Sequence, residues 1–202
     1  MPLRNGCHGE AAPSAKRRLF RMKNWVVLAT RAGSEQKAIG ILKDDLEACG
    51  FIPFAPIKEK AQRQKGVITK KAVQMFPGYV LLQTELEASQ IMDELRLGLR
   101  RDTESENRRI ISILHYGDDK QDVVMREAEL LVLERLLNDD FCFKGSVGFI
   151  VGDKIEIVSG PLKGLESQIK YINRHRREAT IELGMMGAMR EVRVMLEIIK
   201  KC

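Results

Sequence analysis

The side chains best suited to chemistry form one short basic run, Asn173-Arg174-His175-Arg176-Arg177. Guanidinium groups pair bidentately with phosphate oxygens and reach the edges of guanine bases. Because the run lies between two expected strands, it predicts an exposed turn that contacts an RNA hairpin, where shape and backbone dominate recognition. An ordinary solvated turn accounts for the same residues about equally well. The chain on either side of this run supplies four further candidates for RNA contact: Lys163, Lys170, Arg190 and Arg193.

No set of residues predicts catalysis. The sequence contains no GxSxG, Walker A, GxGxxG or HExxH pattern. His8 and His115 have no accompanying cluster of carboxylates or cysteines, so neither indicates acid–base chemistry or a zinc site. The Met-rich segment 185–189 is typical of a turn between strands rather than of a metal or cofactor site. We therefore expect a protein that is not an enzyme and that holds no metal or cofactor.

The cysteines and the hydropathy pattern indicate a cytoplasmic location. Cys7, Cys49, Cys142 and Cys202 include no pair with the CxxC spacing of a metal site, and reduced, unpaired thiols are the simplest interpretation. No apolar run approaches the ~20 residues that a membrane span needs. We expect a monomer that does not contact membranes.

The charge is distributed unevenly along the chain. The net charge is +6, yet residues 22–140 are slightly acidic, while residues 148–202 carry ten Lys or Arg against seven Asp or Glu. Attraction to nucleic acid is therefore expected mainly in the C-terminal part. Residues 1–21 contain Lys16-Arg17-Arg18 without the apolar stretch of a secretory signal. We interpret them as a disordered basic tail; an arm that grips nucleic acid is the alternative.

The periodicity of residues 22–138 predicts an α+β domain with helices on one face of an antiparallel sheet. A proline-bearing extended segment at 51–57 predicts an edge strand, and a charged loop is expected at 100–109. A Lys- and Arg-rich stretch at 58–71 predicts the tip of a hairpin. Strand patterns cover residues 25–30, 79–82 and 110–115, and helical spacing covers residues 35–49, 88–99 and 122–138.

The C-terminal part predicts strands only. In Lys154–Val158 apolar and charged residues alternate, Gly152-Asp153 precedes the strand and Gly160-Pro161 ends it. Closely spaced turns between such strands are typical of a small closed barrel. We place a linker at 139–148 and an all-β barrel at 149–202, with strands at 154–158, 166–172, 179–183, 190–195 and 197–199.

The segment Gly152–Gly164 resembles the KOW motif. A tryptophan-led first strand, then Phe76-Pro77-Gly78-Tyr79, then this motif resemble the NusG family of transcription factors over residues 22–200. The resemblance implies an NGN domain, an SH3-like KOW barrel and binding to the clamp helices of bacterial RNA polymerase. The basic turn, the segment Gly160–Gly164 and a long helix between the domains are most similar to the LoaP branch. Ser167 departs from the family, which usually has Gly there.

The resemblance also implies a polymerase-binding patch. Phe76 and Tyr79 match its apolar residues, and Leu81 lies two positions further on the strand, on the same face as Tyr79. For Phe76, a place in the core of its own domain is an equal alternative. Ser89 and Gln90 fall near a second polymerase contact, although a helix start capped by Ser89 explains them more simply.

Two functions remain open. In the first, the NGN domain binds polymerase and the KOW barrel binds an RNA hairpin in the nascent leader transcript, which gives processive antitermination. In the second, a general NusG-type factor recruits Rho or a ribosomal protein through apolar contacts of the barrel. The basic turn favours the first. The domain that carries Phe76–Tyr79 argues against a third possibility, a ribosomal or generic KOW protein.

Overall fold

The computed structural model describes residues 23–64, 67–105, 108–152 and 154–199, so the expected tail 1–21 lies outside them. The N-terminal domain comprises β1 (Asn24–Thr30), α2 (Glu35–Ala48), β2 (Phe51–Phe54), β3 (Ile57–Gln64), β4 (Val67–Gln74), β5 (Tyr79–Thr84), α3 (Ala88–Gly98), α4 (Arg100–Thr103), β6 (Ile110–Ile113) and α5 (Glu127–Leu136). The C-terminal part comprises β7 (Cys142–Phe143), β8 (Ser146–Val151), β9 (Lys154–Ser159), the 3₁₀ turn η1 (Glu166–Gln168), β10 (Ile169–Asn173), β11 (Glu178–Met185) and β12 (Ala188–Ile198).

An antiparallel four-stranded sheet, in the order β2-β5-β1-β6, forms the centre of the N-terminal domain. The central strand β1 is apolar on both faces because both are covered. Val26 and Leu28 belong to the core beneath α2 and α3, whereas Trp25 and Val27 belong to a second core on the opposite face. We call these the first and the second face of the sheet. The α+β class is confirmed, and the proline-bearing β2 is an edge strand, as expected.

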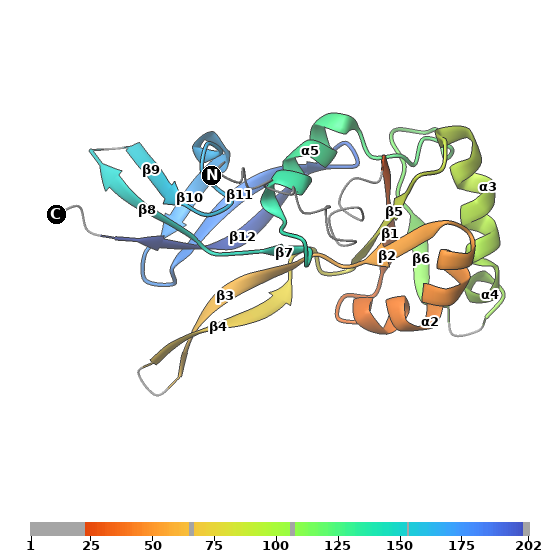
Figure 1. Cartoon of the computed structure of the whole chain (residues 1–202), viewed down its shortest axis with the longest axis horizontal. Helices are drawn as coiled ribbons and strands as arrows, with labels where there is room; N and C mark the ends of the chain where they lie inside the picture. Colours follow the sequence, from red (N-terminus) through yellow and green to blue (C-terminus); the bar gives the residue numbers. More distant parts are fainter. Residues whose placement is uncertain (1–22, 65–66, 106–107, 153, 200–202) are drawn as a thin grey trace, which may run out of the picture.

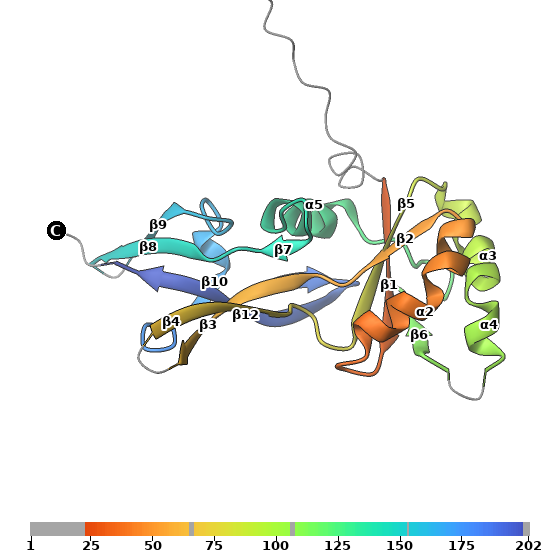
Figure 2. The same cartoon turned by 60° about the horizontal axis from the view of Figure 1, so that its bottom comes forward.

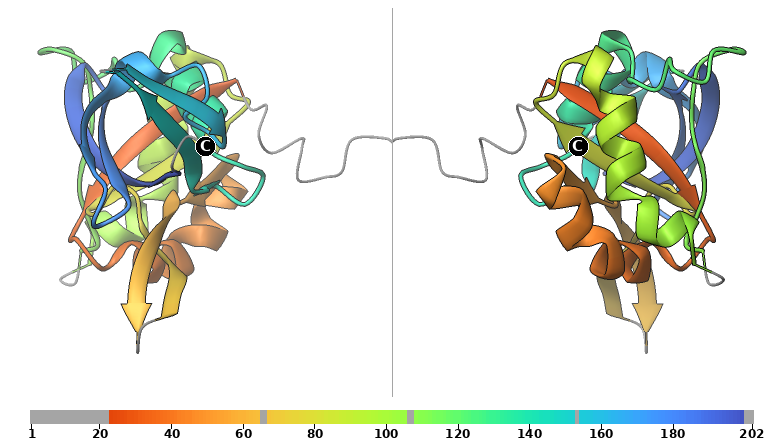
Figure 3. Two further views of the ribbon diagram at one scale, coloured as in Figure 1. Left: turned by 90° about the vertical axis from the view of Figure 1, so that its left-hand side faces the viewer. Right: turned by 90° about the vertical axis from the view of Figure 1, so that its right-hand side faces the viewer.

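A long hairpin of β3 and β4 projects from the N-terminal domain (Figures 1 and 3). Its strands pair from Ile57 opposite Gln74 to Gln64 opposite Val67, so the basic stretch is an extended ladder and not only a tip. Glu59 fixes the base of this hairpin. Its carboxylate accepts hydrogen bonds from the backbone N–H of Gly145 at 3.0 Å and from Lys70 at 3.1 Å, and it lies 3.3 Å from the Lys144 ammonium.

The C-terminal part is a coiled five-stranded sheet in the order β10-β11-β12-β8-β9. The expected KOW-type, SH3-like all-β fold is confirmed. Three details differ. First, β7 and the beginning of β8 fall within 139–148, where we predicted a linker, because this segment pairs with β3 and β12. Second, residues 166–168 form a 3₁₀ turn. Third, β12 is one continuous strand where two were predicted, because it pairs with both β11 and β8.

Two helix predictions need correction. The expected helix at 122–138 begins only at Glu127, because the preceding residues add to the sheet: Val124 bridges Val26, and the Met125 N–H donates to the Trp25 carbonyl at 2.8 Å. The expected loop at 100–109 starts with α4. Its buried Asp102 accepts hydrogen bonds from the N–H groups of Arg109 and Ile110, at 2.6 and 2.9 Å, and so fixes the start of β6.

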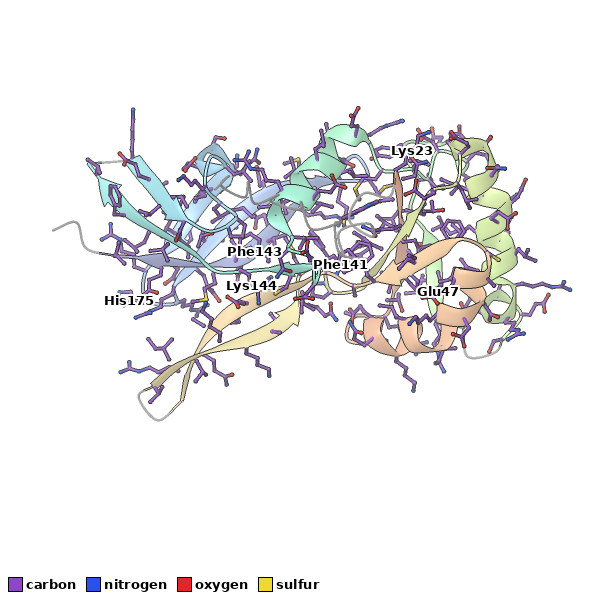
Figure 4. The ribbon with its side chains drawn as sticks, in the orientation of Figure 1. Lys23, Glu47, Phe141, Phe143, Lys144 and His175 are labelled. Atoms are coloured by element: carbon purple, nitrogen blue, oxygen red, sulfur yellow. The ribbon has the colours of Figure 1, made fainter. Side chains whose placement is uncertain are left out.

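The two domains are docked on one another through the second face of the sheet. One continuous apolar cluster includes Trp25 and Leu81 of the sheet, Leu133 of α5, and Leu183 and Val194 of the barrel. Figure 2 shows α5 and the barrel on the same side of the sheet, opposite α2 and α3. Phe141 and Phe143 lie at the junction (Figure 4), and the Phe141 ring stacks on Phe54 with centroids 4.0 Å apart. The barrel and α5 together therefore cover the second face.

Candidate functional site

The predicted polymerase-binding patch faces the barrel. Phe76 is 5% exposed and Leu81 is fully buried, and Tyr79 is half-buried against the same cluster. The guanidinium of Arg190, on β12, lies 5.4 Å from the centroid of the Tyr79 ring. Arg190, an expected RNA contact, thus packs on the patch. Its Nε atom is buried and has no hydrogen-bond partner among the residues that the structure describes.

Ser89 and Gln90 lie apart from that patch. Both are exposed in the first turn of α3, which packs on the first face, whereas Tyr79 belongs to the second. The expected cap at Ser89 is wrong, because the helix starts two residues earlier. Glu87 is the N-cap residue, and its backbone N–H donates to the Gln90 side-chain oxygen at 3.4 Å.

One carboxylate of α5 binds the tip of the β11–β12 hairpin. Glu129 accepts hydrogen bonds from the backbone N–H groups of Met186 and Gly187, each at 3.0 Å. Met186 and Gly187 have φ angles of 53° and 73°, the positive values that a two-residue type I′ turn requires. The turn thereby directs two adjacent N–H groups at one carboxylate. We call this contact the Glu129 latch; no motif or periodicity in the sequence predicted it.

Tyr116 completes the Glu129 latch from the N-terminal domain. Its hydroxyl donates to Glu129 and accepts the backbone N–H of Arg126 at 2.8 Å. The Arg126 guanidinium lies 4.3 Å from the ring centroid. Burial, together with the hydrogen bond to Glu129, raises the pKa of Tyr116 to about 12. The hydroxyl therefore stays protonated at neutral pH and remains a donor to the carboxylate.

The KOW turn contacts the other end of α5. Arg135 donates from Nη2 to the Lys163 carbonyl at 2.6 Å. Gly160 has φ +97°, and a Cβ atom there would lie 2.6 Å from the Ser146 Cα, so only glycine fits. Leu162 is fully buried, whereas the Lys163 side chain is exposed beside α5. Lys163 is therefore separate from the basic run at 174–177.

The basic run forms an ordered turn between β10 and β11. The Asn173 side-chain oxygen accepts the Arg176 N–H at 3.0 Å, and the Arg174 carbonyl accepts the Arg177 N–H at 3.3 Å. Arg174, His175 and Arg176 are exposed. Arg177 is half-buried and pairs with Glu197 at 2.7 Å. We call residues 174–177 the basic turn.

The basic turn borders a groove of about 620 Å³ whose other wall is the β3–β4 hairpin, with Lys60 and Arg63. Sequence reasoning missed these two residues, although the Lys- and Arg-rich composition of 58–71 was a signal. The remaining RNA candidates are dispersed. Lys170 pairs with Glu182 at 2.8 Å on the outer strands, and Arg193 is exposed on β12.

The barrel carries a second, apolar hollow of about 270 Å³. Its lining combines the stem of Lys170 with side chains from β8, β9 and β10, namely Ile150, Ile155, Ile169, Tyr171 and Ile172. Tyr171 is 62% exposed, which is unusual for so large a ring. Such a surface suits an apolar contact with another protein.

Neither metal chemistry nor a membrane span has support in the part of the chain that the structure describes. No group of three or more His, Cys, Asp or Glu is arranged to hold a metal ion there. None of the helices described there has the length and apolar character to cross a bilayer. Cys49 and Cys142 are free thiols, and burial raises the pKa of both.

The comparisons with known proteins identify the N-terminal domain. The family model described as "NusG: Transcription termination factor nusG" matches residues 23–132, which is more than half of the chain. A solved structure entitled "Domain interaction in Thermotoga maritima NusG" shares 21% identity, covers 86% of this chain and 93% of its own, and gives a TM-score of 0.42.

An MjSpt4:Spt5 complex shares 15% identity, covers 85% of this chain and 91% of its own, and gives a TM-score of 0.28. Comparison with curated proteins gave no match. On the strength of the family model, which covers the first strand, the Phe76–Tyr79 turn and most of α5, the chain belongs to the NusG family of transcription factors.

Proposed function

We propose that the chain binds bacterial RNA polymerase through its N-terminal domain and promotes processive antitermination, as the LoaP branch does. NusG-family proteins are transcription elongation factors that act with RNA polymerase and are not enzymes. The matched region contains all five candidate residues: Phe76, Tyr79, Leu81, Ser89 and Gln90. The proposal places the protein in the cytoplasm, as a monomer without cofactor.

Binding acts on polymerase by differential affinity. A factor that binds the clamp helices and bridges the nucleic-acid cleft stabilises the closed, elongating clamp relative to the open state of a paused enzyme. A preference of ~1.4 kcal/mol changes the ratio of the two states tenfold. No bond is made or broken in this mechanism.

The docked barrel must move for polymerase to reach the second face. What supports this step is the burial of Phe76 and Leu81 and the position of Arg190 over Tyr79. In the proposal, Tyr79 is the anchor of the polymerase contact, because its amphipathic ring suits a surface that alternates between two partners.

Co-purification with core RNA polymerase tests the polymerase contact. We expect Tyr79→Ala to weaken binding at least tenfold. Tyr171→Ala, which removes an exposed ring from the barrel, is the matched control and should bind like the wild type. Equal binding by both variants would exclude the Tyr79 patch.

The barrel is proposed to bind an RNA hairpin of the leader transcript through the basic turn. The observation that carries this proposal is the ordered turn with three exposed cationic or titratable side chains, at Arg174, His175 and Arg176. A gel shift of the full chain with leader RNA, comparing the wild type with Arg174→Ala/Arg176→Ala, provides the test. Equal shifts would reject the assignment.

A protein partner of the barrel is the second candidate function. The apolar hollow around Ile155 and Tyr171 favours it, since Rho or a ribosomal protein would bind mainly through apolar contacts. Tyr171→Ser should then abolish recruitment of that protein while RNA binding stays unchanged. If RNA binding falls instead, the hollow belongs to the RNA site.

A further inference from the structure

The groove between the basic turn and the β3–β4 hairpin is built by both domains. Neither domain alone contains it, and its volume is about 620 Å³. Figure 4 shows His175 at the end of the barrel that lies beside the hairpin. The basic residues of its lining are Lys60 and Arg63 on the hairpin wall and Arg174, His175, Arg176 and Arg177 on the barrel wall.

Contacts on both sides fix the distance between the walls. Lys60 crosses from the hairpin to Glu178 at the start of β11, with 3.5 Å between Nζ and Oε1. Glu59 ties the base of the hairpin to the chain at Lys144 and Gly145. Burial alone would raise the pKa of Glu59, but the bonds from Gly145, Lys70 and Lys144 outweigh it and hold the pKa below its ordinary value. The groove is therefore a structured site.

The cations exceed the carboxylates that could neutralise them. Glu178 is the one acidic residue in the lining; it is 9% exposed and engaged by Lys60. Arg63, Arg174 and Arg176 are exposed and form no ion pair with any residue of the described ranges. Three guanidinium groups from two domains are thus available to one ligand.

Lys58, Lys60 and Arg193 lie close enough to one another at the hairpin to interact electrostatically. Burial lowers the pKa of Lys58, and the nearby cations Lys60 and Arg193 lower it further, against the opposite effect of Glu178. Arg193, an RNA candidate from the sequence, thus lies near the hairpin. A bound anion would reduce the repulsion between Lys58 and these neighbouring cations.

The lining favours phosphate over other anions. No Phe, Tyr or Trp side chain lines the groove within the described chain, so stacking of bases there is limited to the His175 ring and the guanidinium planes. Its larger apolar side chain is Ile68, beside Ala61, which gives an acidic protein segment little to anchor on. Guanidinium groups on two opposing walls instead match the phosphates on the backbone of a folded RNA.

We propose that the groove is one composite RNA-backbone site, in which Arg63 of the β3–β4 hairpin and the basic turn hold the same RNA stem. This inference rests on the proposed binding of RNA by the basic turn and extends the site to the N-terminal domain. Because both walls face each other only in the docked chain, RNA in the groove favours docking. Once polymerase takes the second face, the basic turn alone retains the RNA.

Fluorescence anisotropy of the full chain with a labelled RNA stem–loop of arbitrary sequence tests the affinity. Arg63→Gln should weaken binding about three- to tenfold and lower the salt slope by about 1. Lys37→Gln, which removes an exposed charge from α2, is the matched control and should leave both unchanged. An Arg63→Gln variant within twofold of the wild type would overturn the composite site.

Photo-cross-linking shows whether one RNA touches both walls. A photoreactive residue at Gln62, exposed in the hairpin wall, should cross-link to the stem–loop, and Arg174→Gln/Arg176→Gln should abolish the cross-link. A cross-link that survives this double change means that the hairpin binds RNA independently, which contradicts the proposal. If the double change leaves affinity intact as well, RNA binding by the basic turn fails, and the extension fails with it.

Competitors identify the class of ligand. A DNA hairpin of the same sequence should displace the RNA stem–loop only at about tenfold higher concentration, because its backbone geometry differs. An oligoglutamate peptide should compete more weakly still. Equal competition by the DNA, or stronger competition by the peptide, would contradict an RNA site.

Discussion

Both faces of the central sheet are buried by apolar side chains, but different elements cover them. The first face packs on α2 and α3, helices that are joined to neighbouring strands by short turns (Figure 2). The second face packs on α5 and on a separate domain, and polar contacts at both ends of α5, from Glu129 and Arg135, secure that domain.

Apolar burial alone therefore does not distinguish a permanent core from a removable cover. On the first face, Val26 and Leu28 have no alternative environment except water. On the second face, Tyr79 of the N-terminal domain contacts Arg190 of the barrel, a contact that the proposed binding of polymerase would replace. The hydrogen bonds of the Glu129 latch contribute little net free energy, so a partner can replace them. The apolar burial of Leu95 contributes more and has no such substitute.

The largest effect should come from the first face. Leu95→Ala, at a fully buried site on α3, should lower the free energy of unfolding by about 2–5 kcal/mol, because it leaves a cavity in the core. Urea denaturation measures this loss. Leu97→Ala, on the same helix but 59% exposed, should change stability by less than ~0.5 kcal/mol. Similar losses in both would mean that α3 is not the fixed cover.

Breaking the Glu129 latch should release the second face with a smaller effect on stability. Glu129→Ala removes a carboxylate that accepts three hydrogen bonds, so docking should weaken by about 1.5–3 kcal/mol. The expected readout is an affinity for core polymerase at least tenfold above that of the wild type. Glu127→Ala, an exposed neighbour, is the control. An unchanged affinity would show that docking does not limit polymerase binding.

Alkaline pH should loosen the same latch. The pKa of Tyr116 is raised from its ordinary value of 10.0 to about 12. The stability that this group contributes is complete below pH 10 and is lost as the pH rises toward 12, when a phenolate would face the Glu129 carboxylate. Docking of the barrel should weaken over that pH range. Protease cleavage within residues 137–145 measures this change. In Tyr116→Phe the change should disappear.

Acid should have the smallest, graded effect. Burial would raise the pKa of Glu35, but the N–H groups of Gly78 and Gly33, at 2.6 and 2.9 Å, hold it below the ordinary value of 4.5. Its contribution is therefore present above pH 4.5 and lost as the pH falls through the lowered pKa. Thermal melts below pH 4.5 should shift less in Glu35→Gln than in the wild type. An equal shift would assign acid sensitivity elsewhere.

Local patterns in the sequence predicted the fold because they depend on neighbouring residues. The alternation in Lys154–Val158 and the helical spacing after Ser34 both correspond to observed elements. The N-terminus of α5 was missed because Val124 joins β1, a partner almost a hundred residues away. At the start of α2, the Glu35 carboxylate accepts a hydrogen bond from the Gly78 N–H, another contact between residues far apart in the sequence.

The candidate site was only partly accessible to sequence reasoning. The basic turn was identified by composition, but its opposing wall, Lys60 and Arg63, depends on how two domains dock. Arg190 was assigned to RNA by charge alone, whereas the register of β12 places it over Tyr79. Interfaces between domains leave little periodic signal in the sequence. The hydropathy pattern around a buried residue is the same whether that residue packs against its own domain or against the next.

The distance between the domains, measured with and without core RNA polymerase, tests the removable cover most directly. Fluorophores attached at Lys37→Cys on α2 and at Lys170→Cys on β10, both exposed sites, would measure this distance. The variant that carries them has its four native cysteines replaced by serine. We expect energy transfer to fall when polymerase binds and to stay constant with polymerase that lacks the clamp helices. Polymerase binding at unchanged energy transfer would show that the barrel stays on the second face, and the account would be wrong.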